Sequence, residues 1–438
     1  MSFAELGVPE AVIAALGRHG VTTPFPIQAA TLRSSLARRD VLGRGRTGSG
    51  KTVAFAVPAV AALAESGRSR QQRRPRSLIV VPTRELAAQV AAVVAPLAQA
   101  MGLRITTVYG GVAQGPQVSA LRQGIDILVA CPGRLEDLIG QGHCRLDAVE
   151  VTVLDEADHL ADLGFVPAVK RLLDQTPAGG QRLLFSATLD RGVDDLVRRY
   201  LHDPVTHSVD TVDASPPMLE HHTFTVEPDH KAAVVRELAS GIGRSLLFTR
   251  TKHAARKLAR QLVVQGIPAV DLHGNLSQPQ RARNLAAFAD GSARVLVATD
   301  IAARGIHVDD IALVVHVDPP AEAKAYLHRS GRTARAGAAG VVVTVMTPAQ
   351  VGDVRSLVRQ AGISPTVARV GPGDPRTAAL TGPAADLSFL APPQPARRGP
   401  KPSGSAPGRG RSDRRPRAAA SVPQARRSGA SARASGPG

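Results

Sequence analysis

Val151-Thr152-Val153-Leu154-Asp155-Glu156-Ala157-Asp158 is the stretch that decides how this chain folds. Its first half is a largely apolar run, which is typical of a strand buried in a parallel sheet. The acidic residues follow directly, so they emerge at the carboxyl end of that strand, where open α/β sheets bind their ligands. One carboxylate there can hold Mg²⁺ while the next acts on water, and hydrolysis of a nucleoside triphosphate needs both. The stretch therefore predicts an α/β fold with a nucleotide site at the edge of its sheet.

A glycine-rich loop upstream supplies the other half of such a site. Its sequence is Gly45-Arg46-Thr47-Gly48-Ser49-Gly50-Lys51-Thr52, between a strand predicted at 40–43 and a helix predicted at 52–57. Glycines let backbone N–H groups approach phosphates, and a helix N-terminus favours negative charge. The loop therefore predicts nucleotide phosphates held by residues 46–52, with Lys51 on the β- and γ-phosphates and Thr52 on Mg²⁺.

The presence of both the phosphate loop and the acidic stretch predicts a role for each acidic residue. Asp155 is the predicted second Mg²⁺ ligand, directly or through a water, and Glu156 is the predicted base or water-orienting group. Asp158 is expected on the loop that faces a second domain. An acidic helix start would explain such a run if it stood alone. Together with the phosphate loop, the run favours a catalytic set of Lys51, Asp155 and Glu156.

Composition bounds the class of protein. The chain has 438 residues, of which 43% are hydrophobic, enough for two or three domains with cores of their own. Its two cysteines, Cys131 and Cys144, have no metal-binding spacing, which argues against a disulfide framework or a zinc site. No apolar run reaches the roughly 20 residues that span a bilayer, and the N-terminus lacks the features of a signal peptide. We therefore expect a soluble, cytoplasmic protein.

The charge balance points to a polyanionic partner. The formal net charge is +18, and residues 391–438 hold eleven Lys or Arg and a single acid. Such a balance is typical of proteins that bind nucleic acid. The chain has no Trp and only 3% aromatic residues. Base stacking is therefore a weak contributor, and contacts to phosphate and sugar are the better expectation.

Short apolar runs that alternate with helical patterns divide the chain. The first set of alternating strand and helix patterns predicts a parallel α/β domain over 1–205. A Pro-containing connector over 206–217 leads to a second set, which predicts another α/β domain over 218–367. Residues 368–438 are rich in Pro, Gly, Ser and Arg without periodicity, which predicts a disordered basic tail. The predicted strands are 77–81, 125–129, 151–154, 182–185, 245–248, 269–272, 294–297, 312–315 and 341–345, and the predicted helices include 87–99, 193–200 and 351–360.

These motifs and a third segment, His328-Arg329-Ser330-Gly331-Arg332-Thr333-Ala334-Arg335, identify a family resemblance. The chain resembles the DEAD-box ATP-dependent RNA helicases of superfamily two, with the motifs in the family's order from about Phe3 to Val345. The resemblance implies two tandem RecA-like parallel-sheet domains, ATP and Mg²⁺ as substrate and cofactor, and RNA as partner.

The resemblance also implies an adenine-reading segment before the phosphate loop. It consists of Gln28, whose amide offers both a donor and an acceptor to adenine, with Phe3 and Val21 beside it. Val21 stands where the family usually has Phe, so its packing on the base is expected to be weaker. Taken alone, Gln28 would be interpreted as a surface residue of a helix. Its position before the phosphate loop favours the adenine-reading role instead.

The third segment resembles the family's arginine-finger motif. By that resemblance Arg332 and Arg335 stabilise charge on the departing γ-phosphate, and His328 and Arg329 contact the acidic loop of the first domain. A basic helix facing solvent is the alternative. In this segment Ser330 and Ala334 replace the family's usual Ile and Gly. In a separate segment that resembles another family motif, residues 300–307, His307 replaces an Asp expected near the ribose.

An RNA track is implied on both domains, with contacts to backbone and sugar that read little sequence. Cys131 departs from it, because the family usually has Thr there, and we expect it to be a packing residue without a redox role. The residues that match the family's RNA contacts are Thr83, Arg84, Gly110, Gly111, Pro132, Gly133, Arg134, Arg281, Thr299 and Asp300.

A coupling element is implied between the acidic loop and the strand that ends at Phe185. Ser186 and Thr188 have hydroxyls that can bond Asp158 and transmit closure of the two domains. Capping of a helix is the alternative role for such residues, and both roles can hold at once.

The predicted function is ATP-dependent local unwinding of short RNA duplexes or remodelling of RNA–protein complexes. The alternative is a non-catalytic RNA clamp or annealing chaperone that acts through the basic tail, and a DNA helicase is a weaker third option. Ribosomal or RNA-degradation complexes are candidate partners. The sequence names neither the RNA target nor the oligomeric state.

Overall fold

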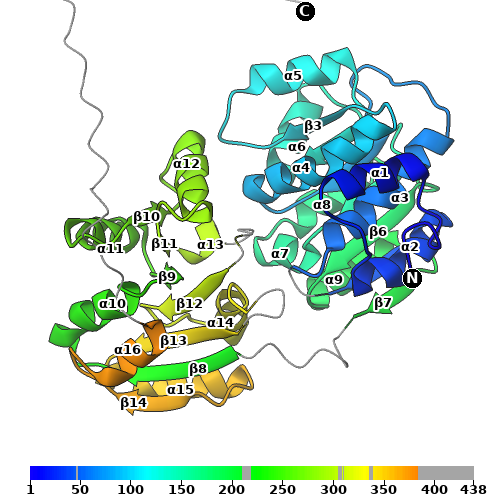
Figure 1. Cartoon of the computed structure of the whole chain (residues 1–438). Coiled ribbons are helices and arrows are strands. Elements are labelled where there is room, and N and C mark those ends of the chain that lie inside the picture. The colour runs from blue at the N-terminus through cyan, green and yellow to red at the C-terminus, as the bar shows by residue number, and fades with distance from the viewer. Residues whose placement is uncertain (46–47, 210–218, 304–307, 309, 335–338, 383–438) are drawn as a thin grey trace, which may run out of the picture. The chain divides into compact units, whose positions relative to one another are not determined.

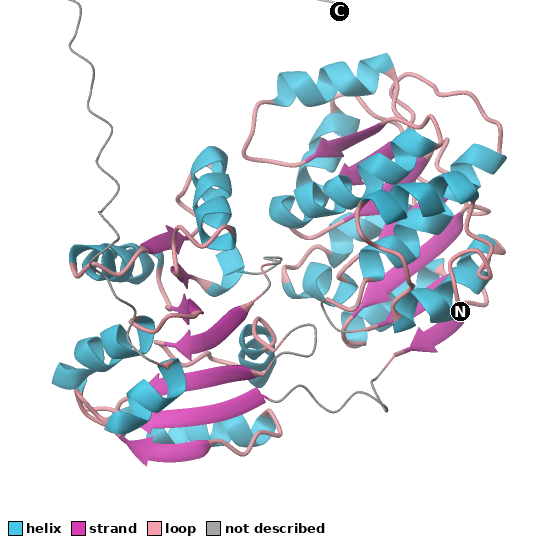
Figure 2. Cartoon of the chain, viewed as in Figure 1, coloured by secondary structure: helices cyan, strands magenta, loops and turns pink. Residues whose placement is uncertain are grey.

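The computed structural model of the chain describes residues 1–45, 48–209, 219–303, 308, 310–334 and 339–382. These residues form two sheets of seven parallel strands each. Figure 1 shows both sheets with their helices, and Figure 2 separates helices from strands by colour. We call the first sheet with its helices the first lobe and the second sheet with its helices the second lobe. The predicted pair of tandem parallel-sheet domains is confirmed.

The first lobe has the strand order β3-β4-β2-β5-β6-β1-β7. Its strands are β1 Val41–Arg44, β2 Ser77–Val80, β3 Ile105–Val108, β4 Ile127–Ala130, β5 Val151–Leu154, β6 Gln181–Ser186 and β7 Val205–Ser208. Its helices are α1 Glu10–Arg18, α2 Pro26–Leu36, α3 Lys51–Glu65, α4 Arg84–Ala100, α5 Gln114–Gln123, α6 Pro132–Gly140, α7 Ala157–Asp162, α8 Val166–Leu173 and α9 Arg191–Tyr200.

The second lobe has the strand order β10-β11-β9-β12-β13-β8-β14. Its strands are β8 Leu219–Thr225, β9 Arg244–Phe248, β10 Ala269–Leu272, β11 Val295–Ala298, β12 Ile311–His316, β13 Gly340–Met346 and β14 Thr366–Arg369. Its helices are α10 Lys231–Ala239, α11 Lys252–Val264, α12 Gln278–Ala289, α13 Asp300–Ala303, α14 Ala323–Ser330, α15 Val351–Gln360 and α16 Pro375–Thr381, with single 3₁₀ turns at Pro228–His230 and Pro348–Gln350.

Both faces of the first sheet are covered, which explains why its central strands are apolar throughout. Alternate strand residues point to opposite faces, so Leu183 and Phe185 join one core with α1 to α4, whereas Leu184 joins the other with α5 to α9. Helix α3 is buried nearly all round because α2 and α4 cover it, and Phe55 on it packs against Phe185 with ring centroids 5.6 Å apart. This packing fixes the beginning of α3 at the carboxyl edge of the sheet.

Two predicted boundaries are wrong. Residues 205–208 form β7, which pairs with β1 in parallel (Val41 with Val205), so the first lobe continues past the predicted start of the connector at 206. The second lobe likewise continues past 367, because β14 pairs with β8 and Thr377 of α16 is buried. Both added strands lie at the edge of a sheet, where half or more of the residues stay accessible and the apolar signal is weak.

The predicted connector over 206–217 otherwise falls on residues 210–218, which lie outside the described residues, as do 383–438 of the predicted tail. None of the described helices is long and apolar enough to cross a membrane.

Candidate active site

The phosphate loop joins β1 to α3, as predicted. Gly48 and Gly50 have φ angles of 89° and 87°, in the left-handed region that glycine adopts without strain. A Cβ on Gly50 would lie 2.5 Å from Nε2 of Gln28, so the close approach also requires glycine. Ser49 has a buried hydroxyl that no described residue hydrogen-bonds, which suits a loop that awaits phosphate oxygens. Arg46 and Thr47 lie outside the described residues.

Lys51 is the first residue of α3 and is only 6% exposed. Its Nζ donates a hydrogen bond to the carbonyl oxygen of Gly45 at 2.8 Å, which folds the side chain back over the loop. Thr52 follows it in the first turn of the helix and is half-buried. The structure therefore places the cation and the hydroxyl that the sequence predicted at one end of the loop.

Asp155 and Glu156 follow β5 directly, and both are buried. Burial raises the pKa of Asp155 to about 7, although the nearby Lys51 charge opposes the rise. A buried carboxylate with this pKa gains most from a divalent cation, since carboxylate oxygen is a hard ligand that Mg²⁺ prefers. No group of three or more His, Cys, Asp or Glu in the described ranges could hold a metal ion unaided. Mg²⁺ on Asp155 and Thr52 would therefore take its other ligands from phosphates and water, as is usual for nucleotide sites.

The pKa of Glu156 is shifted in the opposite direction from that of Asp155. Burial alone would raise its pKa, but a hydrogen bond from His159, with the charges of His159, Lys51 and Arg332, lowers the pKa to about 2. His159 Nδ1 lies 2.9 Å from Glu156 Oε2. Two adjacent carboxylates whose pKa values are pushed apart are the mark of divided roles in catalysis. Glu156 is thus ionised at neutral pH, as a water-orienting group must be.

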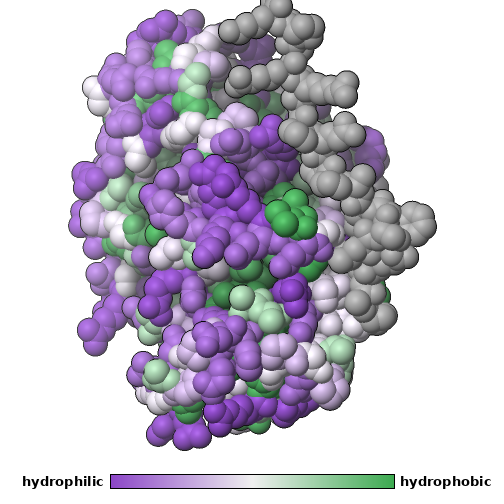
Figure 3. All heavy atoms as spheres, turned by 90° about the vertical axis from the view of Figure 1, so that its left-hand side faces the viewer, coloured by the Kyte–Doolittle hydropathy of each residue, from purple (hydrophilic) through white to green (hydrophobic). Residues whose placement is uncertain are grey.

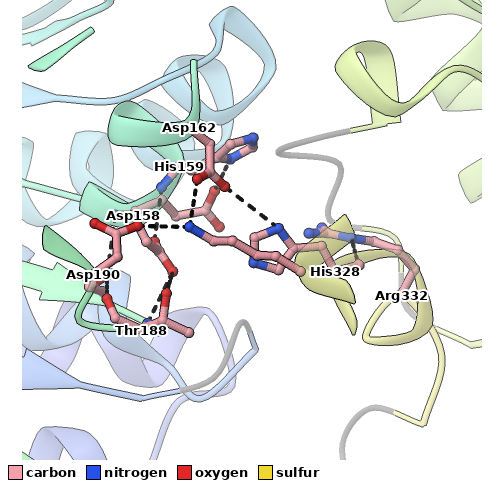
Figure 4. Close-up of polar contacts among 10 residues, drawn as sticks. Asp158, His159, Asp162, Thr188, Asp190, His328 and Arg332 are labelled. Carbon is pink, nitrogen blue, oxygen red and sulfur yellow. Dashed lines mark hydrogen bonds and ion pairs between the residues drawn. The ribbon is translucent and has the colours of Figure 1, made fainter. Parts of the chain in front are cut away.

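The predicted coupling residues are brought together in the first lobe (Figure 4). Asp158 Oδ2 accepts hydrogen bonds from the backbone N–H and the hydroxyl of Thr188, both at 3.0 Å. The Ser186 hydroxyl accepts from the backbone N–H of Asp158 at 3.2 Å and donates to the carbonyl oxygen of Thr188 at 2.6 Å. The acidic loop and the end of β6 therefore form one hydrogen-bonded unit.

The second lobe presents α14 and the residues after it. His328 Nδ1 lies 3.9 Å from Asp162 Oδ2, so His328 does contact the acidic side of the first lobe (Figure 4). Arg332 is 9% exposed, and its Nε donates to the carbonyl oxygen of His328 at 3.2 Å. Its charge is among those that lower the pKa of Glu156, which links the second lobe electrostatically to the acidic loop. Arg335 and His307 lie outside the described residues.

Arg329 does not behave as predicted. It was expected at the acidic loop of the first lobe, but it pairs with Asp300 of its own lobe, at 2.5 and 2.7 Å, and donates to the carbonyl oxygen of Asp318. Its guanidinium also lies over the Phe248 ring, 5.0 Å from the centroid. Arg329 is on the buried face of α14, where its partners lie within the second lobe.

Family models match both lobes. The model described as DEAD/DEAH box helicase matches residues 25–196, and the model of the helicase conserved C-terminal domain matches residues 230–337. An ATP-dependent RNA helicase RhlB of Pseudomonas syringae is 39% identical over 326 residues, which cover 73% of this chain and 82% of that protein. The chain belongs to the DEAD-box helicase family.

Further relatives extend the comparison. The chloroplastic DEAD-box ATP-dependent RNA helicase 3B of Zea mays is 41% identical over 373 residues, but this chain spans only 49% of its length. Among solved structures, S. cerevisiae Dbp5 bound to RNA and ADP BeF3 has a TM-score of 0.75 at 25% identity and covers 86% of this chain and 98% of its own. The tandem RecA-like architecture is therefore the family's.

Within this DEAD-box chain, the predicted adenine residues lie in the first lobe. Gln28 is 1% exposed; its Oε1 accepts from the backbone N–H of Phe25, and its Nε2 donates to the carbonyl oxygen of Gly50, both at 2.9 Å. The amide therefore ties this segment to the phosphate loop. Phe3 is buried in the core and Val21 packs against the same core, so both have a packing role, and their contact with adenine stays a prediction.

The predicted RNA residues of the first lobe lie at the ends of strands or the beginnings of helices. Thr83 caps α4, its hydroxyl accepting from the backbone N–H of Leu86 at 3.2 Å. Gly111 has a φ of 80°, which strains any residue other than glycine, and the Arg84 guanidinium lies against it. Pro132 and Gly133 open α6, and Arg134 on the same turn donates to the carbonyl oxygen of Val112 at 3.4 Å.

Cys131 precedes that turn. Burial raises the pKa of its thiol to about 12, which makes it unreactive. The structure thus supports packing rather than redox chemistry at this position, as expected.

On the second lobe, Arg281 is buried and its Nε lies 2.7 Å from Oε1 of Glu85. Arg84 Nε lies 3.4 Å from the same oxygen. Two arginines predicted to contact RNA therefore share the carboxylate of Glu85, which follows Arg84 in the chain. Thr299 and Asp300 lead into α13, and Asp300 is engaged by Arg329, so the RNA role of Asp300 stays a prediction.

Sequence reasoning missed three polar residues at this site. Glu85 joins the two arginines, and Lys324 Nζ donates to Asp162 and Asp190 at 2.5 and 2.7 Å. His159, the third, holds Glu156. The spacing of His159, three residues after Glu156 at the start of a helix, was a signal, because residues three apart share a helix face. Contacts such as that of Lys324 depend on distant parts of the chain and leave no local pattern.

Proposed function

We propose that the chain is an ATP-dependent RNA helicase that couples hydrolysis of ATP to ADP and phosphate with local unwinding of short RNA duplexes or remodelling of RNA–protein complexes. The observation that carries the proposal is the pair of buried carboxylates beside Lys51. One has a pKa raised to about 7 and the other a pKa lowered to about 2. This division suits a metal-holding group next to a water-orienting group.

The residues divide the work as follows. Lys51 and Arg332 offset the negative charge that builds on the transferred phosphoryl group. Asp155 with Thr52 would hold Mg²⁺, which would supply further positive charge against the phosphates. Ionised Glu156 orients the attacking water. The Asp158–Thr188 unit transmits the state of the nucleotide site to the rest of the first lobe. Arg335 is proposed as a second finger from the family motif.

RNA as the polyanion is supported by the relatives' names and by surface charge. Helix α11 contains no acidic residue, and its Lys252, Arg256, Lys257 and Arg260 are all exposed. Figure 3 views the side on which Figure 1 labels α11, and that face is mostly hydrophilic. Lys252 Nζ donates to Asn275 Oδ1 at 3.1 Å, so the helix begins beside the loop that leads to Arg281. Contacts to phosphate and sugar along this route would be independent of sequence.

A non-catalytic RNA clamp or annealing chaperone is the second candidate, and the DNA helicase is the third. We expect RNA to stimulate ATP turnover, and we expect it to tighten binding of a non-hydrolysed ATP analogue by about 5- to 150-fold, the range that ordinary coupling free energies give. Because linkage is reciprocal for binding, a non-hydrolysed ATP analogue should tighten RNA binding by the same factor as RNA tightens binding of the analogue. Turnover that is absent with and without RNA supports the clamp, and equal stimulation by DNA of the same sequence supports the DNA helicase.

The basic segment 391–438 is proposed to tether RNA. Removing it should weaken RNA binding and reduce its dependence on salt, since each neutralised phosphate of a single strand contributes about 0.7 to the slope of log affinity against log salt. Loss of three contacts would reduce the slope by about 2. The matched control keeps the length and replaces the eleven Lys and Arg by Gln. RNA-binding titrations at several salt concentrations test the tethering role. Unchanged RNA affinity at low salt after removal of the segment contradicts it. Basal ATPase activity should stay nearly intact.

Ribosomal or RNA-degradation complexes remain proposed partners, and a cytoplasmic location remains a prediction from cysteine content. The maize relative is named as chloroplastic and an Arabidopsis thaliana relative as mitochondrial, so the relatives' names give more than one compartment.

A further inference from the structure

His159 is a buried polar residue that the proposed mechanism does not yet use. It lies on α7, is 6% exposed, and its Nδ1 is 2.9 Å from Oε2 of Glu156. Glu156 precedes the helix with a φ of 49°, in the left-handed region where a non-glycine residue is strained. A strained backbone and a fixed side chain at one residue indicate that the position of this carboxylate is over-determined.

The chemistry of the pair defines which atom carries the proton. An ionised carboxylate only accepts hydrogen bonds, so Nδ1 of His159 must be the donor. The other ring nitrogen, Nε2, is buried and has no hydrogen-bond partner among the described residues. No described residue competes for the ring on that side, and the ring is therefore oriented by Glu156.

The two carboxylate oxygens of Glu156 thus differ. Oε2 is held by His159, whereas no described residue hydrogen-bonds Oε1. A carboxylate fixed through one oxygen presents the other in a single direction. Fixing a reacting group in this way reduces the reorganisation that the transition state would otherwise require.

We propose that His159 is a positioning residue for hydrolysis: its Nδ1–H holds Oε2 of Glu156 so that Oε1 faces the attacking water. The inference rests on the proposed function, because it requires Glu156 to act on that water. It assigns His159 a role through Glu156 and not through ATP or RNA directly. Partners that orient metal ligands in this way are typically worth about 10- to 100-fold in activity when removed, and we expect a similar range for the partner of a reacting carboxylate.

Three substitutions separate this role from packing. The side-chain amide nitrogen of Asn lies near the place of Nδ1, whereas that of Gln lies near the place of Nε2. His159→Ala and His159→Gln should both lower kcat by about 10-fold or more, with the KM for ATP changed less than about two-fold. His159→Asn should retain more than half of kcat. Wild-type kcat in His159→Ala, or equal losses in all three variants, overturns the proposal.

A double-mutant cycle tests the route through Glu156. If His159 acts only by holding this carboxylate, adding His159→Ala to Glu156→Gln should lower single-turnover hydrolysis no further than about two-fold. A further 10-fold loss in the double variant means that His159 acts elsewhere and overturns the proposal. Thermal melting of each variant shows whether a loss of rate reflects unfolding, and the Asn variant serves as its folded reference.

The hydrogen bond is also measurable without turnover. The ¹⁵N shifts of the His159 ring, assigned by the signal missing in His159→Asn, should report the Nδ1–H tautomer in the full chain. A Nε2–H tautomer overturns the proposal. Normal hydrolysis by Glu156→Gln with the Nδ1–H tautomer present would instead be a failure of the proposed role of Glu156, so the two failures are distinguishable.

Discussion

Lys51→Ala should reduce ATP turnover by at least about 100-fold, both with and without RNA. The Lys51 ammonium is buried, folded over the phosphate loop onto the Gly45 carbonyl, and is the main charge that opposes the rise in the pKa of Asp155. Its removal takes away a cation from the phosphates and also favours the protonated form of Asp155. A protonated carboxyl is a poor ligand for Mg²⁺. One substitution therefore weakens two parts of the nucleotide site.

The measurement is steady-state ATPase at saturating ATP, with Mg²⁺ varied. Lys170→Ala is the matched control, because Lys170 lies in the same lobe on α8 and pairs only loosely with Asp195 at 3.8 Å. We expect its turnover to equal that of the wild type. Lys51→Ala should also need more Mg²⁺ for whatever activity remains. If Lys51→Ala keeps more than a tenth of the activity, the ammonium is not part of the phosphate site.

The fold was predictable where burial leaves a strong pattern. The predicted strand at 151–154 matches β5 residue for residue, and all four of its residues are buried. The predicted strand at 269–272 also matches β10, although only Leu272 of that edge strand is buried. Strands with mixed composition were not predicted. One of them is β8, which contains Glu220, His221 and His222 and yet lies inside the second sheet between β13 and β14. Hydrophobic periodicity reports burial of side chains, and a strand can be paired on both sides without being apolar.

The site was predictable to the extent that it is local in sequence. The phosphate loop and the acidic stretch are each continuous, and the fold brings both to one edge of a sheet because parallel strands end there together. The partner of Arg329 could not be predicted from the sequence. Its motif predicts a partner in the first lobe, yet the structure pairs it with Asp300. Which of several acids an arginine meets depends on which face of α14 is buried, and that is decided by packing.

Glu156→Gln should hydrolyse ATP at least about 100-fold more slowly while still binding ATP and RNA. The substitution keeps the size of the side chain but not its polarity. His159 Nδ1–H will select the amide oxygen as its acceptor, since the amide nitrogen only donates. The NH₂ group is then presented where Oε1 of the carboxylate was. A donor in that place cannot accept a hydrogen bond from the attacking water, so the water is no longer oriented for attack.

Slow hydrolysis should also slow the release of RNA. ATP and RNA each favour the state that the other binds, and the cycle ends only when the γ-phosphate is lost. RNA should therefore dissociate from Glu156→Gln much more slowly in ATP than in ADP, whereas in ADP its rate should match that of the wild type. Glu136→Gln on α6, where the carboxylate pairs with Arg171 away from the loop, is the matched control. Equal release of RNA in ATP and ADP by Glu156→Gln would mean that hydrolysis is not what frees the RNA, and that the Asp158–Thr188 unit does not couple the two events.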